Sequence, residues 1–140
     1  MGKVAEFVGA FAETHGLPGT VVNAMSLCLD ELLNNTISYG YPDEGRRFIS
    51  ITLSISVQTG GHALVAELRD DAKPFDPRRA RARPRSSELG RRRAGGLGLR
   101  FVNALMDEVD YVRSGEYNQV RLTKTLQPPG AGVTGKEMGK

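Results

Sequence analysis

The segment from Ile49 to Gln58 alternates strictly between apolar and polar side chains. Apolar residues fill every odd position, and serine, threonine or glutamine fills every even one. This period of two predicts a strand with one buried and one solvated face. Gly60 and Gly61 predict a tight turn, and the alternating segment Leu64–Arg69 predicts the partner strand of a hairpin. One apolar face of this hairpin therefore needs a covering layer.

Segments with helical periodicity flank the hairpin and can supply that layer. Four apolar residues at the start recur at the spacing of an amphipathic helix, with Gly16 as its expected C′ residue: Val4, Phe7, Val8 and Phe11. A longer helix is predicted from Pro18 to about Tyr39 or Gly40. A short helix follows the glycines at 95–98 and carries Leu99, Phe101, Val102, Leu105 and Met106.

A second hairpin is predicted near the end, with strands at Val109–Val112 and Val120–Leu126. The predicted fold class is α/β (α+β): a two-layer sandwich whose mixed, mostly antiparallel sheet carries helices on one face. The length of 140 residues suits one domain, expected over residues 1–126. Residues 127–140 contain little to bury and are expected to form a disordered tail.

Composition excludes several classes of protein. The single cysteine, Cys28, rules out an internal disulfide and cannot build a zinc site alone. No apolar run reaches the roughly 20 residues that span a bilayer, and the first residues make a poor secretory signal. We therefore expect a cytoplasmic protein without a membrane partner.

Eight of the 19 basic residues are arginines between Arg78 and Arg93, where Glu88 is the single acid. The segment from Lys73 to Gly95 also lacks a regular apolar period, which predicts a long irregular loop. Such a charge run is commonly a solvated loop. It can also form an electropositive flap near phosphates or an acidic partner. Nucleic-acid binding is disfavoured, because no aromatic residue interleaves the arginines for base stacking.

Three features in chain order can carry chemistry. Glu31 and Asn35 lie four residues apart in the predicted long helix, so their side chains share a face. A carboxylate can accept a proton, and an amide oxygen can bind a hard cation such as Mg²⁺. Asp70 ends the second strand, and Gly96 and Gly98 precede a helix whose free N–H groups can attract phosphate. Each feature alone has an ordinary structural explanation; their order makes the pattern informative.

The sequence around these features resembles a known group of ATPases. The segments ELLNNTISYGYPDE, RDDAKPFDP and GGLGLRFVNALMDEVDY resemble the N box and the two glycine boxes of the GHKL (histidine-kinase-like) ATPase superfamily. The PFDP sequence and the short chain resemble the anti-sigma factor serine/threonine kinases within it. The resemblance extends from about Phe7 to Leu126 and implies the Bergerat ATP-binding fold.

The resemblance also assigns roles. It implies ATP or ADP and Mg²⁺ as ligands, Glu31 as the general base, Asn35 as the magnesium ligand, and Asp70 as the acceptor for the adenine amino group. Further nucleotide-binding positions fall on Ala72, Gly96, Leu97, Gly98 and Leu99. Three positions depart from the family pattern near the nucleotide: Ala72 replaces a glycine, Tyr39 a common histidine, and Asn118-Gln119 a Gly-Thr pair.

The function implied by this resemblance is an ATP-dependent protein serine/threonine kinase that acts as an anti-sigma factor in transcription regulation. Its expected partners are a STAS-type anti-anti-sigma protein, which it phosphorylates, and a sigma factor; the resemblance also suggests a homodimer. The alternative is a non-catalytic nucleotide-binding module that sequesters a regulatory partner, motivated by Ala72. A histidine kinase is disfavoured, because neither His15 nor His62 lies in a phosphoacceptor setting.

Overall fold

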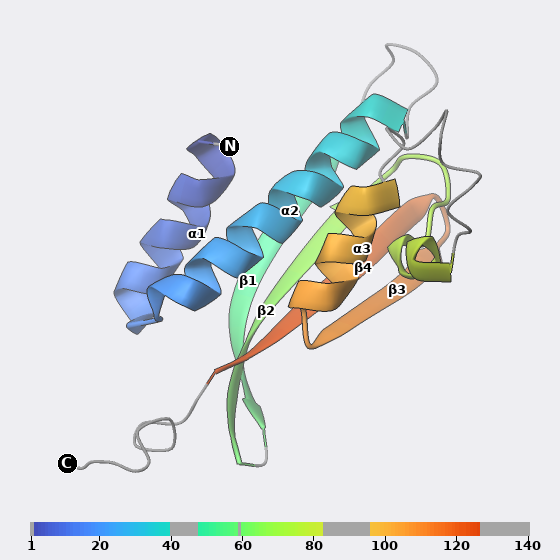
Figure 1. Ribbon diagram of the computed structural model, residues 1–140. Coiled ribbons are helices and arrows are strands. Elements are labelled where there is room, and N and C mark those ends of the chain that lie inside the picture. The colour runs from blue at the N-terminus through green and yellow to red at the C-terminus, as the bar shows by residue number, and fades with distance from the viewer. Residues whose placement is uncertain (1, 40–47, 59, 83–95, 127–140) are drawn as a thin grey trace, which may run out of the picture.

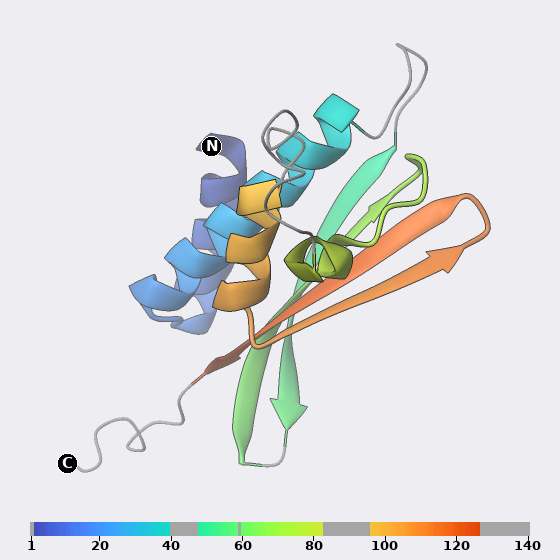
Figure 2. The ribbon, with the colours of Figure 1, turned by 45° about the vertical axis from the view of Figure 1, so that its right-hand side comes forward.

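The computed structural model describes residues 2–39, 48–58, 60–82 and 96–126. In these residues, three α-helices lie on one face of a four-stranded sheet (Figures 1 and 2). The elements in chain order are α1 (Gly2–His15), α2 (Gly19–Tyr39), β1 (Ile49–Gln58), β2 (Gly61–Asp70), the 3₁₀ helix η1 (Pro77–Ala82), α3 (Gly96–Leu105), β3 (Glu108–Ser114) and β4 (Tyr117–Leu126). The predicted two-layer α+β sandwich is confirmed.

The strand order in the sheet is β1-β2-β4-β3, and all three described pairings are antiparallel. Gly60 and Gly115 turn the two hairpins with positive φ values of 85° and 60°, a conformation that glycine adopts without steric cost. The chain reaches β3 at the sheet edge before β4 returns between β3 and β2. This return places Asn118 of β4 directly opposite Asp70 of β2.

The hydrophobic core lies between the sheet and the helices. Its fully buried large side chains include Met25 and Leu29 from α2, Leu64 and Leu122 from the sheet, and Leu99 from α3. Burying one such side chain stabilises the fold by about 1.5–3 kcal/mol. Cys28 is buried in the same core, and this burial raises the pKa of its thiol to about 11, which agrees with a packing role.

Two sequence predictions need correction. Val57 was expected on the buried face of β1 but is 79% exposed, because the hairpin of β1 and β2 extends past the helices at this end (Figure 1). The irregular loop predicted from residue 73 contains η1. Asp76 starts this helix by accepting a hydrogen bond from the Arg78 N–H (2.9 Å), and Pro77 occupies its first position.

The helix ends follow the predicted signals. Gly16 ends α1 with a φ of 65°, as expected of a C′ residue. No helix within the described part of the chain is long and apolar enough to cross a membrane. Most of the arginine segment (residues 83–95) and the predicted tail (127–140) lie outside the described residues. The domain boundary at residue 126 therefore stays a prediction.

Candidate nucleotide-binding site

A cavity of about 200 Å³ lies between α2 and the ends of β2 and β4. Its lining is mostly apolar, with a few polar groups, which is the usual character of a ligand site. The residues that line it are Leu32, Asn35, Thr36, Leu68, Asp70, Ala72, Lys73, Phe75, Pro77, Asn118 and Val120. Drug-sized ligands occupy sites of roughly 300–1,000 Å³, so this cavity suits one planar base better than a whole nucleotide. It brings together three of the predicted residues: Asn35, Asp70 and Ala72.

Asp70 ends β2 with a side chain that is only 3% exposed. Its Oδ1 atom accepts hydrogen bonds from the Ala72 N–H (3.0 Å) and from Asn118 Nδ2 (2.9 Å). No donor among the described residues bonds to Oδ2. A buried carboxylate has unfilled acceptor capacity here, which suits a ligand that presents an N–H group to the cavity.

Ala72 is the position at which the family pattern has glycine. Its side chain is 4% exposed and lines the cavity. Its N–H binds Asp70, and its carbonyl accepts hydrogen bonds from Arg113 Nη1 (2.8 Å) and Asn118 Nδ2 (3.2 Å). The methyl group therefore adds apolar surface to the cavity wall while the backbone of this turn keeps its partners.

Asn35 is 8% exposed, and its Oδ1 atom is buried without a hydrogen-bond partner in the described structure. Leaving such an acceptor unsatisfied costs about 1–3 kcal/mol. A divalent cation ligated by oxygen atoms would satisfy this carbonyl. The described residues contain no cluster of three or more His, Cys, Asp or Glu side chains that could hold a metal on its own. The donor at Asn35 therefore fits Mg²⁺ that arrives with phosphate oxygens as its other ligands.

Glu31 lies one helical turn before Asn35 and faces the first turn of α3. A Cβ atom built on Gly98 would lie closer than 3.0 Å to the carboxyl atoms of Glu31, which real Cβ atoms essentially never do. Gly98 is thus a point where α3 leaves room for this carboxylate. Burial raises the pKa of Glu31, and the neighbouring charge of Asp30 raises it further. A carboxylate with a raised pKa is a stronger base, as proton abstraction requires.

The remaining predicted positions lie in the first turn of α3, which starts at Gly96. Leu99 is 1% exposed and belongs to the core, so only its backbone is available to a nucleotide. The first N–H groups of a helix have no partner within it and attract anions. Within this helix start, which includes Gly96, Leu97 and Gly98, Gly98 lies beside Glu31, and phosphates bound at these N–H groups would complete the site.

The sequence model of the histidine kinase-like ATPase domain matches residues 1–124. The chain belongs to the histidine kinase-like ATPase family. It is 30% identical over 104 residues to the serine/threonine-protein kinase BtrW of Bordetella bronchiseptica, an alignment that covers 74% of this chain and 70% of BtrW. The family resemblance seen in the sequence is confirmed.

A solved structure shows the same fold. The histidine kinase domain of a blue-light activated histidine kinase from Erythrobacter litoralis superposes with a TM-score of 0.55 at 19% sequence identity. The superposition covers 88% of this chain and 65% of that domain. The family match and the similarity to BtrW identify the chain as an ATP-binding domain of kinase-like type, and domains of this family typically bind Mg²⁺ with ATP.

Within this histidine kinase-like ATPase domain, one central residue was not predicted as part of the site. Asn118 was noted only as a departure from the family pattern, yet it is 4% exposed, lines the cavity and donates to Asp70. Thr36, Lys73 and Phe75 also line the cavity and were not predicted. The signal for Asn118 was its antiparallel register with Asp70, which becomes readable only when β2 is known to pair with β4.

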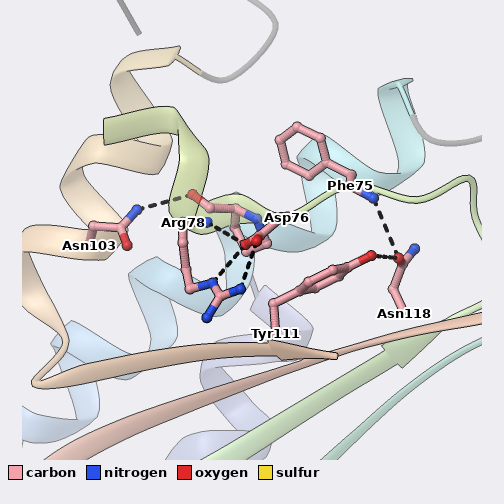
Figure 3. A network of polar contacts seen from close by, with 7 residues as sticks. Phe75, Asp76, Arg78, Asn103, Tyr111 and Asn118 are labelled. Atoms are coloured by element: carbon pink, nitrogen blue, oxygen red, sulfur yellow. Dashed lines mark hydrogen bonds and ion pairs between the residues drawn. The ribbon is translucent and has the colours of Figure 1, made fainter. Parts of the chain in front are cut away.

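The start of the arginine segment is attached to α3. Asn103 Nδ2 donates to the carbonyl oxygens of Pro77 (3.2 Å) and Leu99 (2.8 Å), as Figure 3 shows for the contact with η1. Arg78 forms an ion pair with Asp76 (2.8 Å), and the hydrogen bond from Arg78 lowers the pKa of the Asp76 carboxyl. The hydrogen bond from Asn103 thereby holds η1 beside α3, and Pro77 of η1 lines the cavity.

Proposed function

We propose that this chain is an ATP-dependent protein serine/threonine kinase that acts as an anti-sigma regulatory factor. The observation that supports this most is a pair of acceptors on residues that line one cavity: the buried Oδ1 of Asn35, which has no hydrogen-bond partner among the described residues, and the Oδ2 of Asp70, whose described hydrogen bonds all go to Oδ1. The first suits Mg²⁺ and the second suits the amino group of adenine. Similarity to a serine/threonine kinase supports the class of acceptor.

In the proposed reaction, Asp70 accepts a hydrogen bond from the adenine amino group and fixes the base in the cavity. Mg²⁺ bound at Asn35 would neutralise charge on the phosphate oxygens. Glu31 takes the proton from a serine or threonine hydroxyl as its oxygen bonds to the γ-phosphorus. The bond between that phosphorus and the β,γ-bridging oxygen breaks, and ADP leaves with the electron pair. The raised pKa of Glu31 supports its role as base.

The proposed partners come from the family resemblance. We propose a STAS-type anti-anti-sigma protein as the phosphoacceptor and a sigma factor as the second partner, so that phosphorylation decides which of the two is bound. We also propose that the kinase acts as a homodimer in the cytoplasm.

Phosphate transfer from labelled ATP to STAS-domain proteins of the same genome tests the proposal. Glu31→Gln keeps the size of the side chain and removes the base, so we expect transfer to fall by about 10²–10⁴-fold while ATP binding persists. The matched control is Glu13→Gln on exposed α1 surface, which should transfer phosphate like the wild type. Equal rates for Glu31→Gln and wild type would refute the base assignment.

The second candidate, a non-catalytic nucleotide-binding module, predicts a different result. The buried methyl of Ala72 on the cavity wall is the feature that favours it. In that case ATP and ADP raise the melting temperature, but no STAS-domain protein is phosphorylated. Restoring the family glycine with Ala72→Gly would then test whether the methyl group is what limits transfer.

A further inference from the structure

We propose that Asn118 is the positioning residue that makes Asp70 selective for a base with a 6-amino group. This inference rests on the proposed function, in which Asp70 binds the adenine amino group. Asn118 is one of the positions at which the sequence departs from the family pattern, and the proposal gives it a role in nucleotide recognition. The neighbouring Tyr111 acts with Asn118, because its hydroxyl fixes the orientation of the Asn118 amide.

The hydrogen bonds of Asn118 define that orientation. Its Nδ2 atom lies 2.9 Å from Asp70 Oδ1, 3.2 Å from the Ala72 carbonyl oxygen and 3.0 Å from that of Lys73. All three are acceptors, so the opposite amide orientation would place an oxygen among three oxygens. The Oδ1 atom accepts from Tyr111 Oη (2.6 Å) and from the Phe75 N–H (3.4 Å), as Figure 3 shows.

These contacts hold the Asp70 carboxylate in one orientation. Asn118 Nδ2 and the Ala72 N–H both bind Oδ1, which leaves Oδ2 as the atom available to the cavity. A hydrogen bond contributes most to selectivity when its acceptor is preorganised and buried, because no side-chain freedom is lost on binding. Asn118 thus adds a second hydrogen bond to that of the Ala72 N–H, and the two together oppose rotation of the carboxylate.

A purely structural role for Asn118 is the alternative that the test has to separate. The residue also ties the backbone at Ala72 and Lys73 to β4, so its loss could loosen the cavity wall in general. General loosening weakens every nucleotide alike. Misplacement of the Asp70 acceptor weakens only nucleotides that carry the 6-amino group.

The probes are ATP and purine riboside 5′-triphosphate, which lacks the 6-amino group, each titrated calorimetrically with Mg²⁺ present. We expect the wild type to prefer ATP by about 10- to 100-fold, the range for one hydrogen bond to a charged group. In Asn118→Ala the preference should fall to about threefold or less. Tyr111→Phe, which keeps the amide, should reduce it in part and carries the test if Asn118→Ala does not fold.

The matched control is Tyr117→Phe. Tyr117 precedes Asn118 in β4, so it faces the other side of the sheet. There the Cζ atom of Arg69 lies 4.0 Å from the centroid of the Tyr117 ring. This variant should keep the full preference for ATP. If Asn118→Ala and Tyr111→Phe weaken both nucleotides by the same factor, Asn118 has only a structural role and the inference is wrong.

Asp70→Asn separates failure of this inference from failure of the proposed function. If Asp70→Asn abolishes the preference while Asn118→Ala and Tyr111→Phe keep it, adenine recognition by Asp70 stands and the role of Asn118 is refuted. If the wild type itself shows no preference for ATP, Asp70 does not read the amino group. Both the proposed adenine contact and the inference then fail together.

Discussion

Replacing Gly98 by alanine tests whether this glycine, in the first turn of α3, positions the Glu31 carboxylate for catalysis. The new Cβ would lie closer than 3.0 Å to the Glu31 carboxyl atoms, whereas ordinary contacts of a Cβ lie at 3.4–4 Å. Gly98 has no positive φ, so alanine meets no backbone strain. The relief has to come from the Glu31 side chain, whose carboxylate must retreat by roughly 1–1.5 Å to reach ordinary contact distance.

The expected effect on stability is small. Alanine is up to about 1 kcal/mol more favourable than glycine within a helix. Moving Glu31 off its preferred rotamer costs about 0.5–1.5 kcal/mol. The two terms nearly cancel, so the melting temperature of Gly98→Ala should stay within about 4 °C of the wild type.

The expected effect on catalysis is large. A displacement of about 1 Å in a catalytic group can reduce a rate by about 10²-fold. Phosphate transfer by Gly98→Ala, measured at saturating ATP, should fall by that order. The matched control is Gly9→Ala in α1, where no atom beyond the adjoining residues and backbone of its own helix lies within 4 Å of the added Cβ; it should keep full activity.

A double variant separates the displaced base from a direct collision with the nucleotide. If Gly98→Ala acts through Glu31, adding it to Glu31→Gln causes no further loss of transfer, because the interaction is already gone. If the added methyl instead meets the phosphates, ATP affinity falls in both backgrounds. Wild-type transfer rates in Gly98→Ala would refute the close placement of Glu31 against α3.

Two further predictions follow from the same α2 residues. Asn35→Ala removes a buried oxygen that has no partner in the described structure, so the free protein should melt no lower than the wild type. The Mg²⁺-dependent gain in ATP affinity should be lost. Melting temperatures of the free protein, and of the protein with ATP in the presence and absence of Mg²⁺, check the two expectations. Burial and Asp30 raise the pKa of Glu31, so its contribution to stability is fully present below its unfolded pKa of about 4 and is lost as pH rises through the folded value. Glu31→Gln should therefore melt above the wild type at pH 7, and this difference should disappear below about pH 4; a constant difference at all pH values would contradict the raised pKa.

Much of the fold is readable from the sequence because its signals are local. The strand Ile49–Gln58 was predicted to the residue, since a period of two is visible without any knowledge of the partner strand. η1 was missed because it is one short helix set by the Asp76 side chain, which leaves no apolar period. The exposure of Val57 was missed because the reach of the helices over the sheet is a tertiary property.

The site was predictable in its separate parts but not in its connections. The pairing of Glu31 with Asn35 follows from helical spacing, and in the structure Asn35 and Asp70 line the same cavity. The contact of Asp70 with Asn118 joins residues 48 positions apart. This contact forms because β4 lies between β2 and β3 in the sheet, and no local sequence pattern predicts that strand order.

The distribution of satisfied and unsatisfied polar groups distinguishes the roles of the buried residues. Asn118 Nδ2 and Asp70 Oδ1 satisfy each other within the protein, so they form a fixed frame before any ligand arrives. Asn35 Oδ1 has no such partner, and neither has the buried Ser26 Oγ among the described residues. Ser26 does not line the cavity, whereas Asn35 does. An unsatisfied acceptor indicates a ligand where it also faces a space that the ligand can occupy, and of these two atoms only the Asn35 oxygen meets both conditions.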